Sequence, residues 1–143
     1  MNLNHLIIIS VIKKDTAKDW TEMGVIRKLM KDIDLAKSDL EHSYKIYEEN
    51  EKTNTDEFGK CLFELACIYQ EEKDSKAIEY LQRVVNIPSL SDDLKSKSLI
   101  QLGKFIIEFQ FLKIFYQKKK ELNVFIKVKH KEQKKIFKKH FQL

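Results

Sequence analysis

The sequence is poor in the residues that interrupt or turn a chain, since its 143 residues include three glycines and one proline. Folds rich in β-hairpins need many such residues in their turns. Leu, Lys, Glu, Gln and Ala dominate several stretches, which favours helices. Residues 6–12 and 124–128 have the β-branched and aromatic content that suits strands, but two segments are too few for a sheet domain. We therefore expect an all-α fold.

The sequence also lacks the long apolar run of a membrane span, which needs roughly 20 residues. The apolar residues 6–12 follow five residues without Lys or Arg and run into Lys13 and Lys14, which is unlike a secretory signal. Cys61 and Cys67 lie six apart, a spacing that turns them to different faces of one helix and prevents a disulfide. We expect a cytoplasmic chain with both thiols reduced.

Signatures of catalysis and of metal or cofactor binding are missing as well. The four histidines lie far apart and match no metal-ligand spacing: His5, His42, His130 and His140. The three glycines are isolated, so no phosphate-binding loop is present. Acidic pairs such as Glu48 and Glu49 fall at helix ends or turns, where capping and solvation explain them. The sequence predicts a protein that is not an enzyme and needs no cofactor or metal.

A spacing of small and large apolar residues recurs along the chain. The first unit contains Trp20, Met23 and Gly24 and then Ala36 and Leu40. The second contains Leu62, Leu65, Ala66 and Tyr69 and then, after a shorter turn, Ala77, Leu81 and Pro88. The third keeps Leu99, Leu102, Gly103 and Ile106 before the pattern ends.

Over residues 17–110 this recurrence resembles the tetratricopeptide repeat family. The resemblance implies antiparallel helical hairpins stacked as a short α-solenoid. Small residues on the first helix of each pair, namely Gly24, Ala66 and Gly103, would face Ala36 and Ala77 and let the helices approach closely. Large residues would fill the spaces between hairpins: Trp20, Leu62, Leu65, Tyr69, Leu81 and Leu99.

Candidate capping residues place the helix starts, namely Asp15 or Thr16, Asp32 or Asp34, Thr55 or Asp56, and Asp74 or Ser75. Helices are expected at about 17–31, 32–50, 56–70, after 74 or 75, and from about 92, beyond Pro88. The predicted domains are an apolar extension over 1–16, the repeat domain over 17–110, and a basic amphipathic helix or capping segment over 111–143.

The resemblance implies a scaffold or adaptor that binds a peptide or helix of a partner protein in a concave groove. The lysine and asparagine clamp of the chaperone-adaptor members is not found at the matching positions, which disfavours chaperone tails as partners. Candidate partner-binding residues lie between the packing positions of the first helices: Arg27, Lys28, Lys60, Glu64 and Lys104. Two and a half units are few for a free-standing array, so a homodimer or a larger assembly is an open alternative.

The end of the chain differs in charge from the rest. Residues 111–143 contain 11 of the 27 basic residues and 2 of the 22 acidic ones, giving +9, while residues 1–110 carry −4. Apolar residues fall near helical spacing between the lysines, with a polar gap at 129–133, which indicates an amphipathic basic helix that is either continuous or broken in two at the gap. Such a segment would either cap the repeat array or bind nucleic acid, an anionic membrane surface or an acidic partner.

Overall fold

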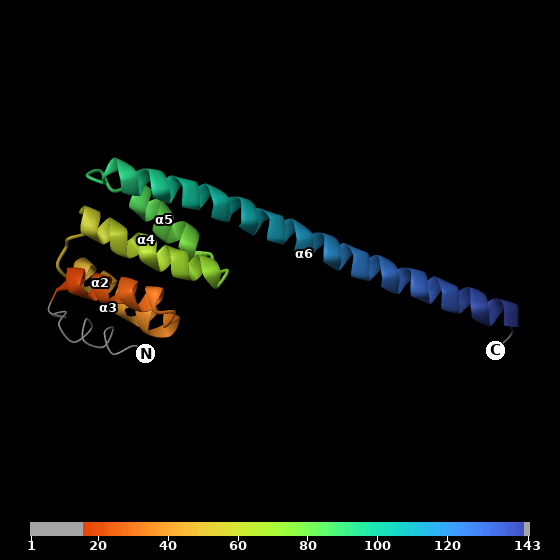
Figure 1. Ribbon diagram of the computed structural model, residues 1–143. Helices are drawn as coiled ribbons and strands as arrows, with labels where there is room; N and C mark the ends of the chain where they lie inside the picture. Colours follow the sequence, from red (N-terminus) through yellow and green to blue (C-terminus); the bar gives the residue numbers. More distant parts are fainter. Residues whose placement is uncertain (1–15, 142–143) are drawn as a thin grey trace. The chain divides into compact units, whose positions relative to one another are not determined.

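The computed structural model describes residues 16–141, and its regular structure over that range is entirely helical (Figure 1). The helices are α2 (Ala17–Leu29), α3 (Ile33–Glu49), α4 (Asp56–Glu71), α5 (Lys76–Val85) and α6 (Asp92–Phe141). The prediction of an all-α fold is confirmed for these residues. Residues 124–128 belong to α6, whereas residues 6–12 lie outside the described range.

Side-chain caps begin three of the helices at the predicted places. The Thr16 hydroxyl accepts a hydrogen bond from the backbone of Asp19, whose carboxylate bonds back to Thr16 in a capping box. Asp32 caps α3, and Thr55 accepts from the backbone N–H of Phe58 at the start of α4. Such caps satisfy backbone donors that the first turn of a helix leaves free. The helix boundaries therefore follow from local sequence.

Helices α2 and α3 form an antiparallel hairpin and lie side by side (Figure 1). The two helices approach closely at Gly24. A Cβ atom on Gly24 would lie 2.6 Å from Cγ of Leu40 and 3.2 Å from the carbonyl oxygen of Ala36. The predicted role of Gly24 opposite Ala36 is confirmed.

Alanine substitutions at two helical glycines are expected to have opposite effects. Gly24→Ala should lower the free energy of unfolding by up to about 2 kcal/mol, because overpacking costs about 1–3 kcal/mol and the higher helix propensity of alanine offsets about 1 kcal/mol. Gly103→Ala should raise it by about 0.5–1 kcal/mol, because a Cβ there meets nothing within 4 Å. Urea unfolding of both variants measures the difference. Equal effects of the two substitutions would contradict the close approach of α2 and α3.

Helices α4 and α5 form a second antiparallel hairpin, and contacts between the two hairpins recur at a nearly constant sequence separation. Lys37 bonds to Glu72, and Glu48 bonds to Arg83, in each case 35 residues along the chain. At the same separation, Asp56 at the start of α4 accepts from the backbone of Ser91, which precedes α6. Contacts 35 residues apart therefore join α3 to the end of α4, α3 to α5, and the start of α4 to the start of α6.

The core lies in the first of two compact units, which ends at Ile106. Its fully buried side chains include Met23, Leu40, Phe58, Leu62, Leu65, Ile68, Leu81, Val84 and Phe105. One polar pair is buried with them: the hydroxyls of Thr21 and Ser43 lie 2.6 Å apart, and Ser43 donates to the carbonyl oxygen of Ala17. These bonds satisfy groups that would otherwise be costly to bury.

Two packing residues of the third predicted unit were wrongly assigned. Leu99 is 50% exposed, and Gly103 faces open space. Leu99 was expected to fill a space between hairpins, and Gly103 was expected to allow the close approach of a second helix. The chain instead continues α6 without a turn, so within the described residues no such helix forms.

Helix α6 shows which of the two predicted forms the end of the chain takes. The segment from residue 111 is not a separate helix but the continuation of α6, and residues 129–133 are helical without a break. Lys and Glu are good helix formers, which explains why a polar gap does not interrupt the helix. The second compact unit begins at Ile107, within this helix.

Candidate functional site

The predicted partner-binding residues come from three helices of the first unit, and the structure joins two of them. Lys28 on α2 donates to the Glu64 carboxylate on α4, with side chains 28% and 15% exposed. Burial opposes the charge of Lys28, but the hydrogen bond and charge of Glu64 outweigh it and raise the pKa of Lys28. This pair connects the first helices of the two hairpins.

The other three residues are not joined to this pair. The Arg27 guanidinium forms an ion pair with Asp39, at 3.0 Å, inside the first hairpin. Lys60 is exposed one turn before Glu64 on α4, and Lys104 is exposed on α6. Lys60 and Lys104 therefore present their charges to solvent, whereas Arg27, Lys28 and Glu64 are engaged in packing.

Sequence reasoning missed a second set of contacts, on α3 and α5. Arg83 donates to the Tyr44 hydroxyl and to Glu48, both at 2.6 Å, and its guanidinium lies 5.4 Å from the ring centroid of Phe58. The hydrogen bond from Arg83 lowers the pKa of Glu48. These residues lie 35 and 39 positions from Arg83, so no short motif could reveal them. The sequence separation of each pair, which is close to the length of one helical hairpin, was the only signal in the sequence that could have indicated these contacts.

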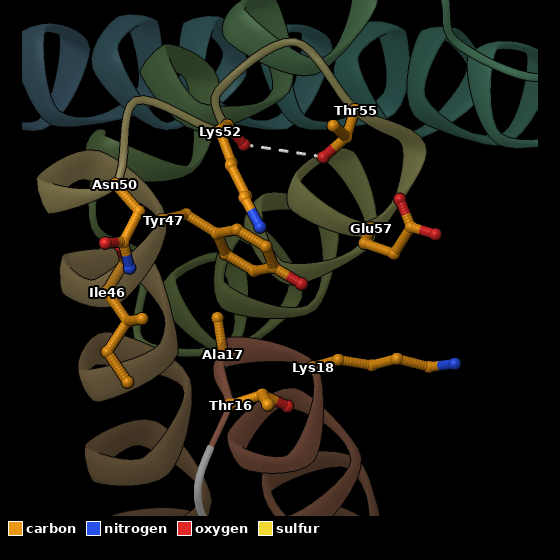
Figure 2. Close-up of a pocket in the computed structure, with 9 residues that line it drawn as sticks. All are labelled: Thr16, Ala17, Lys18, Ile46, Tyr47, Asn50, Lys52, Thr55 and Glu57. Carbon is orange, nitrogen blue, oxygen red and sulfur yellow. Dashed lines mark hydrogen bonds between the residues drawn. The ribbon is translucent and has the colours of Figure 1, made fainter.

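A hollow of about 620 Å³ lies where α2 begins, α3 ends and α4 begins (Figure 2). It is lined by Thr16, Ala17, Lys18, Ile46, Tyr47, Asn50, Lys52, Thr55 and Glu57. Figure 2 shows the ring of Tyr47 in the middle of these side chains. The Tyr47 hydroxyl has no hydrogen-bond partner among the described residues, and burial raises its pKa to about 12. The hydroxyl is therefore neutral at physiological pH.

Both cysteines lie on α4, as expected, and neither is paired in a disulfide. Burial raises the pKa of Cys61 and of Cys67 to about 11. Since the thiolate is the reactive form of cysteine, both thiols are poor nucleophiles at neutral pH.

The part of α6 beyond Ile106, which forms the second compact unit, is a second candidate interface. Most of its residues are exposed, and they include both lysines and large apolar side chains. Lys118 pairs with Glu121 and Lys129 pairs with Glu132, each at 3.3 Å and three residues apart. Such exposed pairs contribute little to stability. The remaining lysines leave the segment strongly basic.

Two further kinds of site were sought in residues 16–141. No group of three or more His, Cys, Asp or Glu side chains is arranged to hold a metal ion. None of the helices described combines the length and apolar character needed to cross a membrane.

No protein-family model, curated protein or solved structure matches the chain.

Proposed function

We propose that the first unit is a short α-solenoid of the tetratricopeptide type, which acts as a cytoplasmic scaffold and binds a peptide or helix of a partner protein. The observation that carries this proposal is the Lys28–Glu64 pair, since it brings the first helices of successive hairpins together. In a stacked array these helices line one continuous face. The Lys37–Glu72 and Glu48–Arg83 contacts, each between residues 35 positions apart, also join the two hairpins and support the same arrangement.

The binding surface in this proposal contains the exposed ammonium groups of Lys60 and Lys104. Unpaired charges at the edge of an interface steer a partner of opposite sign and set its register. An acidic peptide or helix is therefore the favoured partner. Arg27, Lys28 and Glu64 would shape the face by holding the helices together.

Reversing the two exposed charges tests the scaffold function. Lys60→Glu with Lys104→Glu is expected to reduce partner recovery about tenfold in affinity capture with the full chain, because attraction becomes repulsion. The recovered protein would be identified and its affinity measured by titration. Lys45→Glu with Lys95→Glu is the matched control, since Lys45 lies on α3 and Lys95 lies about 180° around α6 from Lys104. Equal losses in the two variants, or no loss in either, would contradict the proposal.

A second candidate function is polyanion binding through residues 111–143. The observation that favours it is the net charge of +9 on a segment whose described lysines are all exposed. Anionic phosphates attract such clusters over about a Debye length, or ~8 Å in physiological salt. Retention on heparin that weakens with salt is the expected behaviour.

A further inference from the structure

Residues 111–143 contain a repeat of 11 residues. Three consecutive segments, 111–121, 122–132 and 133–143, each have two large apolar residues at their fourth and fifth positions. These six residues are Ile114, Phe115, Phe125, Ile126, Ile136 and Phe137, called here the apolar stripe. The first two segments also share a Lys at position 8 and a Lys-Glu pair at positions 10 and 11.

An 11-residue period keeps the apolar stripe on one side of the helix. Eleven residues complete three helical turns with a drift of about 20°, so equivalent positions stay nearly in line. An 11-residue period suits either a nearly flat partner or a right-handed supercoil with a second helix. The charges on the segment distinguish the two.

The apolar stripe is exposed in the second unit. Its six side chains are 53–61% exposed. Large apolar side chains that recur on one face without cover mark an interaction surface. The opposite face carries Lys113, Lys120, Lys127, Lys131, Lys134 and Lys138.

Lys118 and Lys129 decide which kind of partner fits. At helical spacing both fall within the apolar stripe, and the Lys129 ammonium lies 5.7 Å from the ring centroid of Phe125. A protein interface would have to bury these ammonium groups together with the Glu121 and Glu132 carboxylates that pair with them, and burying ion pairs costs free energy. At a lipid headgroup boundary, a lysine stem can lie among apolar side chains while its ammonium reaches phosphate and water.

We propose that the part of α6 from residue 111 to residue 141 lies on anionic phospholipid membranes, with the apolar stripe in the headgroup and acyl boundary. This inference deepens the polyanion-binding function proposed above and rests on it. A basic face and an aromatic and aliphatic face, on a helix that is not apolar enough to cross a membrane, are typical of interfacial helices. Nucleic acid would contact the lysines and leave the apolar stripe in water, and a second copy would bring +9 against +9.

Vesicle sedimentation of the full chain tests the inference. The chain is expected to bind phosphatidylcholine vesicles that contain phosphatidylserine, and to bind pure phosphatidylcholine weakly, because each lysine near an anionic surface adds attraction. Phe115→Ser, Ile126→Ser and Phe137→Ser together should lower binding roughly a hundredfold, because one apolar anchor is lost from each segment. Circular dichroism with vesicles reports whether the variant remains helical.

The matched control places three serines off the apolar stripe, as Tyr116→Ser, Val124→Ser and Val128→Ser. It makes a comparable change in helix propensity and should retain binding within about threefold. Equal losses in control and stripe variants would overturn the inference.

Heparin and single-stranded RNA separate the inference from the function on which it rests. Both the wild-type chain and the stripe variant should bind these polyanions equally, because the lysines are unchanged. Binding to RNA and heparin without binding to vesicles would overturn the lipid inference and leave polyanion binding in place. Binding to none of the three would overturn both. A wild-type chain that is dimeric and does not bind vesicles, together with a monomeric triple-serine variant, would show that a second copy covers the apolar stripe and would overturn the lipid inference.

Discussion

Replacing Phe58 with alanine is expected to lower the free energy of unfolding by about 3–5 kcal/mol. The Phe58 ring is 1% exposed and joins three elements of the first unit. Its centroid lies 5.9 Å from that of Tyr44 and 5.5 Å from that of Tyr47, both on α3. The Arg83 guanidinium covers it from α5. Truncation would leave a cavity that these side chains cannot fill without losing their own contacts.

Phe125→Ala is the control for this prediction. The Phe125 side chain is 58% exposed, so the same substitution should change stability by less than about 0.5 kcal/mol. Urea unfolding followed by circular dichroism measures both variants. A larger loss at Phe125 than at Phe58 would mean that the stabilising core lies elsewhere.

A chain that ends after Ser91 is expected to be unfolded or at least about 3 kcal/mol less stable than the full chain. The removed start of α6 contributes the buried Phe105 and Ser98. The Leu94 side chain packs close to α4, since a Cβ atom on Gly59 would lie 3.2 Å from Cδ2 of Leu94. In addition, the Gln101 side chain donates a hydrogen bond to that of Gln70, at 2.7 Å. Without these residues, one side of α4 is open to water.

A chain that ends after Ile106 should keep its stability within about 1 kcal/mol, because the second compact unit begins at the next residue. Thermal unfolding of the two shortened chains compares them directly. Similar instability of both chains would show that the first unit depends on residues beyond Ile106.

The helices could be predicted from local sequence because their ends depend on local bonds. Asp32 and Thr55 cap helices at the expected positions, and Pro88 lies in the break before α6. Small residues were less informative than caps. Gly24 is at a close approach, as predicted, but Gly103 is not, and Gly59 packs tightly against Leu90 without having been expected to do so. The spacing of small residues cannot show whether a partner helix exists.

The candidate site was predictable only in part. Spacing along helices selected Lys28 and Glu64, which do meet. It could not show that Arg27 is held by Asp39, because that pair depends on how α2 turns into α3. The Arg83 cluster was missed for the same reason, since its partners become neighbours only when hairpins stack. Contacts between distant residues depend on the tertiary arrangement, which is difficult to infer from the spacing of residues in one sequence.

Amide hydrogen exchange of the full chain, with and without phosphatidylserine vesicles, most directly tests the division into a packed helical body and an exposed basic helix. Amides of α3 and α4 should exchange slowly in both conditions, because their helices are buried by tertiary packing. Amides of residues 107–141 should exchange fast in solution, since an isolated helix is marginal in water, and slowly on vesicles. Slow exchange of residues 107–141 in solution, equal to that of α4, would show that another surface already covers the helix and would contradict the account.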